Sequence, residues 1–142
     1  MLAPNANASC HEFVSHHSAV DETECAITVG FSRDPADEAS IDGLLLQRGK
    51  DLRETVPGIR GVYVEILIQR YVVYGGIVEA WLRRDRFILQ FDDTTASKMG
   101  YFHQILVRFD LADKEFIAIR DGLRFVFSAC PCYREDERAA GS

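Results

Sequence analysis

The sequence predicts an α+β fold: a curved antiparallel sheet of about six strands, close to the usual sheet size, with a C-terminal amphipathic helix packed on one face. Three observations support this prediction. Apolar and polar residues alternate through most of residues 24–109, which is the period of strands with one buried face. Only short connections separate these segments, as in an antiparallel meander. Between residues 111 and 127 the apolar spacing changes to three and four, which is the period of a helix.

The first predicted strand covers residues 24–31. One of its faces is uniformly apolar and carries Cys25, Ile27, Val29 and Phe31. Cys25 is therefore expected to be a small core residue. A second, short strand is expected at 44–49. Loops rich in turn residues are expected at 34–43 and 50–61, and the second of these has room for one helical turn.

Residues 62–73 are expected to form one long strand. Its apolar face would carry Val62, Val64, Ile66 and Ile68. Its opposite face would carry Tyr63, Glu65, Leu67, Gln69 and Tyr71. Gly75 and Gly76 interrupt the pattern, and because glycine adopts positive φ without strain they predict a hairpin turn or a bulge between two strands. The pair lacks the strand, turn and helix context of a phosphate-binding loop.

A further strand is predicted at 77–83. One of its faces would carry Val78, Ala80 and Leu82, and the other Ile77, Glu79, Trp81 and Arg83. A tight turn at Arg84 and Asp85 leads into a strand at 86–91, whose apolar face carries Phe87, Leu89 and Phe91. Residues 92–100 begin with capping residues and end in glycine, which predicts a short helical turn.

The last strand and the long helix complete the pattern. The strand, at 101–109, would bury Tyr101, Ile105, Val107 and Phe109. The helix, at 111–127, has an apolar stripe made of Phe116, Ile119, Leu123 and Val126. Asp110 or Asp113 is expected to cap its start. Gly122 costs helix stability, which suggests a close approach of the helix to the sheet.

The chain of 142 residues fits a single domain. We expect this domain to cover residues 10–132, between a disordered N-terminal tail at 1–9 and a disordered charged tail at 133–142. No signal peptide and no apolar run of about 18 residues is found, which predicts a cytoplasmic protein without membrane contact. Four cysteines are then expected to be reduced: Cys10, Cys25, Cys130 and Cys132.

The charge of the chain bears on its partners. The formal net charge is -6 at pH 7. Such a chain repels phosphate backbones, and nucleic acid binding requires basic clusters, so we expect no nucleic acid partner. A basic protein would instead be attracted, with faster encounter at low salt.

Motifs for metal binding and catalysis are weak. Four residues near the two ends could meet in space, namely Cys10, His11, Cys130 and Cys132. The two terminal cysteines are only one residue apart, which is not a common zinc spacing, and His16 and His17 would point to opposite faces of a strand. The sequence contains none of the common hydrolase, P-loop or metalloprotease motifs. We therefore expect no metal, no cofactor and no enzyme activity.

Three ordered segments, at 43–49, 62–91 and 107–127, resemble the immunity protein 10 family of bacterial polymorphic toxin systems. The resemblance is carried by an LLQR strand, by the pair Tyr63 and Glu65, by the sequence Tyr74-Gly75-Gly76, and by an FDL motif that precedes the helix. It implies a small cytoplasmic α+β protein that neutralises a cognate toxin by stoichiometric binding and performs no chemistry.

Six residues are candidates for toxin binding: Tyr63, Glu65, Tyr71, Tyr74, Glu79 and Trp81. The aromatic side chains would act as anchors, and the glutamates would meet basic groups of the toxin. Two features of this region also have a purely structural interpretation. Gly75 and Gly76 can form only a turn, and Trp81 can pack against the helix or a loop.

Two other functions are compatible with the sequence. A carrier of small apolar ligands would need a deep cavity lined by Val64, Ile66 and Leu82. An enzyme would need cysteine, histidine or carboxylate side chains that converge in one cleft. The sequence leaves open whether the protein is a monomer or a homodimer paired through a strand edge.

Overall fold

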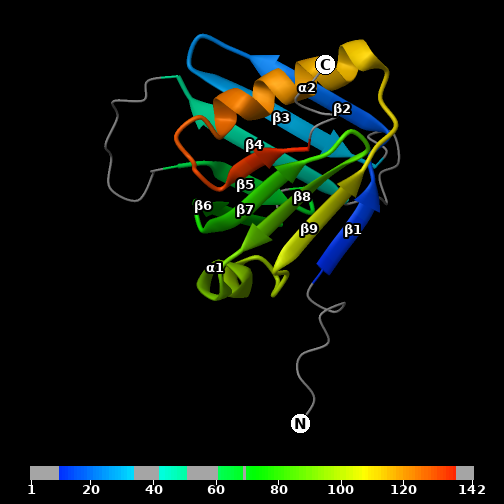
Figure 1. The fold of residues 1–142 in the computed structure, drawn as a ribbon. Helices are drawn as coiled ribbons and strands as arrows, with labels where there is room; N and C mark the ends of the chain where they lie inside the picture. The colour runs from blue at the N-terminus through cyan, green and yellow to red at the C-terminus, as the bar shows by residue number, and fades with distance from the viewer. Residues whose placement is uncertain (1–9, 34–41, 51–60, 69, 137–142) are drawn as a thin grey trace.

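Two five-stranded sheets pack against each other, and two helices accompany them (Figure 1). The computed structural model describes residues 10–33, 42–50, 61–68 and 70–136. The α+β class predicted from the sequence is confirmed, but the prediction of one curved sheet with about six strands is wrong. The chain passes from one sheet to the other at Gly75 and Gly76, and the alternating pattern continues across this crossing.

The first sheet, here called the meander sheet, is antiparallel throughout, with each strand beside the next in sequence. Its strands are β2 (His17–Glu22), β3 (Ala26–Ser32), β4 (Gly43–Gly49), β5 (Tyr63–Ile66) and β6 (Tyr71–Tyr74). The second, the mixed sheet, has two parallel edge strands. Its strands, in spatial order, are β1 (Cys10–Val14), β9 (Gln104–Arg108), β8 (Arg86–Phe91), β7 (Ile77–Leu82) and β10 (Tyr133–Glu135).

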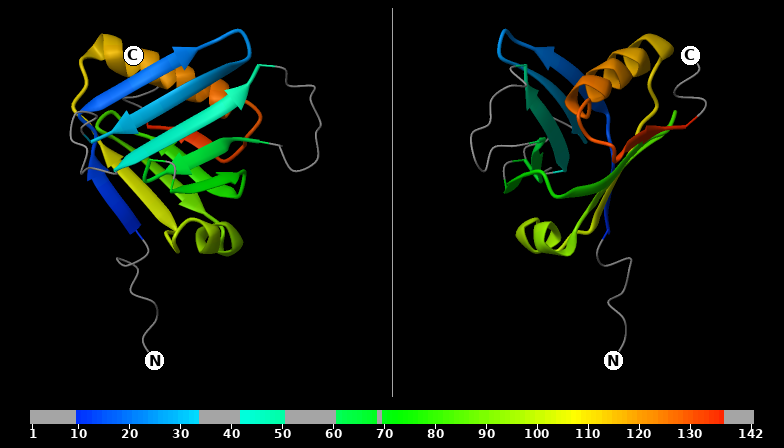
Figure 2. Two further views of the ribbon diagram at one scale, coloured as in Figure 1. Left: turned by 180° about the vertical axis from the view of Figure 1, so that it is seen from behind. Right: turned by 60° about the vertical axis from the view of Figure 1, so that its left-hand side comes forward.

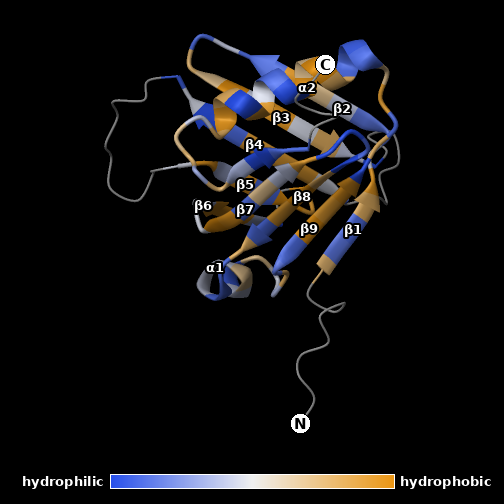
Figure 3. Ribbon diagram, in the orientation of Figure 1, coloured by the Kyte–Doolittle hydropathy of each residue, from blue (hydrophilic) through white to orange (hydrophobic). Residues whose placement is uncertain are grey.

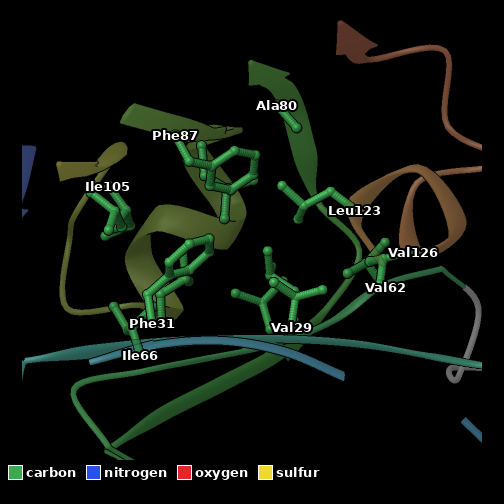
Figure 4. Close-up of a cluster of buried hydrophobic side chains, with 14 of the residues drawn as sticks. Val29, Phe31, Val62, Ile66, Ala80, Phe87, Ile105, Leu123 and Val126 are labelled. Atoms are coloured by element: carbon green, nitrogen blue, oxygen red, sulfur yellow. The ribbon is translucent and has the colours of Figure 1, made fainter. Parts of the chain in front are cut away.

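The apolar faces of the two sheets form one core (Figure 4). Phe31 of the meander sheet stacks on Phe87 of the mixed sheet with ring centroids 6.0 Å apart, and on Phe109 at 5.8 Å. Each fully buried side chain of this kind contributes about 1.5–3 kcal/mol to folding. The predicted buried face of Phe87, Leu89 and Phe91 is confirmed. Because both inner faces serve the core, each sheet has one outer face left. Hydrophobic and hydrophilic residues follow one another along the strands (Figure 3).

Helix α2 (Asp113–Val126) packs across β2, β3 and β4 (Figure 2). The predicted stripe is confirmed, since its members Phe116, Ile119, Leu123 and Val126 are all buried. The close approach expected at Gly122 is also confirmed, because a Cβ there would lie 2.8 Å from Cγ2 of Val29. The expected cap is wrong: the N-cap is Ala112, without a side-chain hydrogen bond, and Asp113 lies in the first turn.

The long strand predicted at 62–73 is wrong, because β5 and β6 form an antiparallel hairpin. The chain turns at Leu67 and Ile68, which have φ of 52° and 44°. Apolar residues rarely adopt this left-handed region, so the sequence carried no turn signal. The turn changes which side chains share a face. Tyr71 therefore lies on the inner side, whereas Val72 and Tyr74 point outward with Tyr63 and Glu65.

The predicted glycine turn is a crossing between the two sheets. Gly75 and Gly76 have φ of 74° and 76°, and a bulge follows between Ile77 and Glu79. The hairpin predicted at the glycines is wrong, and the bulge lies after the pair and not at it. Because of the bulge, Val78 is exposed and does not share the buried face of Ala80 and Leu82, with which its spacing had grouped it.

The segment after β8 follows the prediction in part. Helix α1 (Asp93–Lys98) confirms the expected helical turn, and the side chain of Asp92 caps it by accepting from the backbone N–H of Thr95. The next strand, β9, begins only at Gln104. Tyr101 is exposed with φ of 66°, so its expected place on the buried face of a strand is wrong.

Both ends of the chain contain strands that the sequence did not indicate. Residues 133–135 form β10 beside β7, so the disordered tail expected from residue 133 is wrong in its first part.

Cys130 and Cys132 form a disulfide, which overturns the expectation that all four cysteines are reduced. Cys25 is exposed in the turn that precedes β3 and is not a core residue. The expected tail at 1–9 lies outside the described residues.

The helices of the described residues, α1 and α2, are not long and apolar enough to cross a membrane.

We predict that Gly76→Ala destabilises the fold by about 2–4 kcal/mol, because left-handed strain adds to overpacking. A Cβ at this position would lie 1.8 Å from Oγ1 of Thr95. Urea denaturation measures the free energy of unfolding. Gly49→Ala is the control, since a Cβ there meets only the carbonyl of Cys25 at 3.8 Å. Equal stability of the two variants would contradict the assigned crossing.

A second prediction concerns Glu135, which accepts hydrogen bonds from Arg124 at 2.7 and 2.8 Å. Arg124 holds the pKa of this carboxyl below its ordinary value. The interaction stabilises the fold above the unfolded-state pKa and is lost as pH falls through the lowered folded-state pKa. Glu135→Gln should therefore cost about 1 kcal/mol at neutral pH and almost nothing near pH ~3. Urea denaturation at both pH values checks this, and an equal cost at both would contradict it.

Candidate functional site

The six candidate residues lie on three different surfaces. Tyr63, Glu65 and Tyr74 share the outer face of the meander sheet. Tyr71 lies on its inner side, where its ring packs within about 3 Å of the Cβ position of Gly100. Glu79 and Trp81 lie on the outer face of the mixed sheet. The structure therefore brings three of the six together on one face, places Glu79 and Trp81 together on another, and leaves Tyr71 apart from both groups.

Tyr63, Glu65 and Tyr74 form a connected group. Tyr63 and Tyr74 are partners across β5 and β6, and their rings make an edge contact with centroids 5.2 Å apart. The hydroxyl of Tyr63 donates to Oε1 of Glu65 at 2.8 Å. Because the carboxylate accepts this hydrogen bond and so favours the protonated phenol, it raises the pKa of Tyr63 to about 12. Both side chains are thereby held in one orientation on the outer face.

Beside this group the sheet has a hollow of about 300 Å³. Its floor follows one row of partners across the strands, Ala19, Gly30 and Leu45, and the same row continues to Glu65. His17 and Ile68 also line it. Of these six residues, the sequence pointed only to Glu65. Gly30 was the available signal, because glycine inside a strand often marks a close approach of another molecule.

Exposed apolar side chains gather on the hairpin next to the hollow. Among the described residues, six large hydrophobic side chains are exposed, and three of them belong to this hairpin. These are Ile68, Val72 and Tyr74, with 51%, 44% and 46% of their surface accessible. We call them the hairpin patch. Exposed apolar groups that cluster beside a polar rim are typical of interaction sites.

Trp81, on the other outer face, already has partners within the chain. The guanidinium of Arg134 lies 4.0 Å from its ring centroid, and that of Arg83 lies at 5.1 Å. Arg134 also pairs with Glu79. Trp81 thus packs under two guanidinium groups, one from β10 and one from the connection between β7 and β8. A partner that binds Trp81 and Glu79 would compete with Arg134 for both side chains.

The groups considered for metal or catalytic chemistry lie apart. Cys10 is on β1 and Cys132 adjoins β10, and these strands are the opposite edges of the mixed sheet. His103 pairs with Asp93 at 3.0 Å, and His11 with Asp42 at 3.1 Å. No group of three possible metal ligands occurs among the residues that the structure describes.

The cavity required by the carrier hypothesis is also missing from its expected place. Val64, Ile66 and Leu82 are completely buried in the core between the sheets. None of them lines the hollow, which opens on the outer face instead. The arrangement therefore favours contact with a partner surface over enclosure of a ligand within the fold.

Comparison with known families identifies one match. A family model described as immunity protein 10 matches residues 14–117, and this match confirms the resemblance seen in the sequence. No match was found among curated proteins or among solved structures. The matched range contains every residue of the hollow and of the hairpin patch.

We predict that Glu65→Gln lowers the pKa of Tyr63 from about 12 toward its ordinary value of 10. The substitution removes the negative charge that disfavours the phenolate. NMR titration of the labelled tyrosine ring measures the change. The raised pKa also implies that the Tyr63–Glu65 interaction stabilises the fold below pH ~10 and is lost as pH rises through about 12. An unchanged titration would contradict the hydrogen bond.

Proposed function

The chain belongs to the immunity protein 10 family, and from this premise we propose that it neutralises a cognate protein toxin by stoichiometric binding in the cytoplasm, without catalysis. An inhibitor of this kind needs a surface that presents apolar anchors and complementary charge to its partner.

We assign the docking surface to the outer face of the meander sheet. The observation that carries this assignment is the hairpin patch of Ile68, Val72 and Tyr74, which lies beside the ordered pair Tyr63 and Glu65. An exposed tyrosine supplies a large contact area with few rotatable bonds, so its ordering on binding costs little entropy. Tyr71 supports this hairpin from its inner side and does not itself touch the toxin.

Charge favours a basic toxin. The chain carries a formal net charge of -6, and Glu65 stands at the centre of the docking surface. No Lys or Arg of the described residues forms an ion pair with Glu65, so its charge is available to a partner. Long-range attraction would accelerate encounter at low salt, and the effect would decrease as salt screens it.

Glu79 and Trp81 define the competing surface on the mixed sheet. Their contacts with Arg134 would have to be broken on binding, which adds a cost that the meander sheet does not carry. The two outer faces can therefore be compared directly by substitution. In this proposal the active form is a monomer, because the docking surface is complete within one chain.

We predict that Tyr74→Ala combined with Glu65→Ala weakens toxin binding at least about tenfold, as expected when a central anchor and its charged neighbour are removed. A candidate toxin from a neighbouring gene is co-expressed, and growth rescue is scored. Calorimetry with the purified pair then gives affinity and stoichiometry. Trp81→Ala combined with Glu79→Ala is the matched control on the mixed sheet and should change affinity less than about threefold.

The possible outcomes separate the claims. A larger loss in the mixed-sheet variant would move docking to that face. Growth arrest despite co-expression of the unmodified chain, together with no measurable binding, would refute neutralisation of that toxin.

A further inference from the structure

The hollow on the meander sheet exists because one strand residue has no side chain. Gly30 lies in the middle of β3, between Ala19 on β2 and Leu45 on β4. A Cβ built on Gly30 would meet nothing within 4 Å. Its backbone does not have the positive φ that would require glycine. Glycine inside a strand weakens the strand, and the backbone conformation here does not require it. The missing side chain therefore provides only open space above the sheet.

One wall of the hollow is held in a strained conformation. Ile68 has φ of 44°, which is unfavourable for a β-branched residue. Its Cγ1 lies 3.0 Å from the position of a Cβ on Gly43, so the absence of a side chain at Gly43 lets Ile68 lean over the sheet. More than half of Ile68 stays exposed in this position. Such strain tends to persist at sites where the resulting geometry is used.

The rim of the hollow is charged on one side. Glu65 borders it from β5, and the hydroxyl of Tyr63 fixes one carboxylate oxygen at 2.8 Å. His17 borders it from β2, on the far side of Gly30. Since no basic side chain of the described residues pairs with Glu65, a cation from outside would find an oriented carboxylate directly beside an apolar hollow.

We propose that the hollow receives a single apolar side chain of the toxin, and that an adjacent arginine or lysine of the toxin pairs with Glu65. This inference rests on the proposed function. The volume, about 300 Å³, is at the small end for ligand pockets and suits one side chain better than a whole cofactor. The hairpin patch continues the apolar surface from Ile68, so the seated side chain would be surrounded by contacts that exclude water.

A peptide experiment tests the hollow without the toxin. The full chain is isotope-labelled and titrated with acetyl-Phe-Arg-amide, for which millimolar affinity is expected from its size. The amide signals of Ala19, Gly30 and Leu45 should shift. Acetyl-Ala-Arg-amide should cause no shift, and acetyl-Phe-Glu-amide should bind at least about fivefold more weakly because it meets Glu65 with like charge.

The matched variants are Gly30→Val and Gly49→Val. Valine at position 30 fills the hollow, whereas position 49 lies at the end of β4, outside it, where a Cβ meets only ordinary contacts. Both should remain folded, as thermal unfolding checks. Gly30→Val should abolish the peptide shifts and weaken toxin binding at least about tenfold, while Gly49→Val should change neither by more than about twofold.

The results distinguish this inference from the proposed function. If the toxin binds and Gly30→Val matches Gly49→Val in affinity, the receptor role of the hollow is overturned and neutralisation stands. If acetyl-Phe-Glu-amide binds as well as acetyl-Phe-Arg-amide, the basic neighbour is overturned. If the peptide shifts appear as expected but the toxin does not bind, the hollow remains a receptor for this side-chain chemistry and the toxin assignment fails.

Discussion

The contact on which the fold depends is the stack of Phe31 against Phe87 and Phe109, because it joins the inner faces of two sheets into one core. Side chains alternate between the two faces of a strand, so a residue that points inward has neighbours that point outward. Gly30, which precedes Phe31 on β3, must therefore face solvent. The same alternation places Tyr63 and Glu65 outside, since Val64 and Ile66 are fully buried. The candidate surface is thus a direct consequence of the packing that stabilises the protein.

The two outer faces have different energetics, although both contain aromatic residues. On the mixed sheet, Trp81 lies under Arg134, and this cation–π contact together with the pair to Glu79 already satisfies the groups that a partner would use. On the meander sheet, the contacts of Tyr63 orient Glu65 but do not neutralise it. Organised groups with unused charge lower the cost of association. This difference, and not aromatic content, is the reason for proposing the meander sheet as the docking surface.

The apolar periodicity of the sequence was sufficient to predict much of the core. It did not indicate that the strands divide into two sheets. The stripe of α2 and the buried face of β8 follow from spacing alone, and Gly122 correctly indicated a close approach. The hairpin could not be found, because Leu67 and Ile68 turn in a conformation that their types disfavour. Because of this turn, Tyr71 lies on the inner side of the sheet and not on the face of Tyr63 and Glu65, where it was predicted. A shift of one residue along a strand exchanges its two faces. Short, polar edge strands carry too little pattern to be recognised.

The family match adds an argument about where function lies in the chain. It covers residues 14–117, which include the whole meander sheet, the hollow and the crossing at Gly76. The segment beyond it contains most of α2, the Cys130–Cys132 disulfide and β10 with Arg134. Arg134, which covers Trp81, therefore lies outside the matched range. The hairpin patch and the residues that shape the hollow lie within it. A surface complete within the matched range is the better candidate for a property of the family.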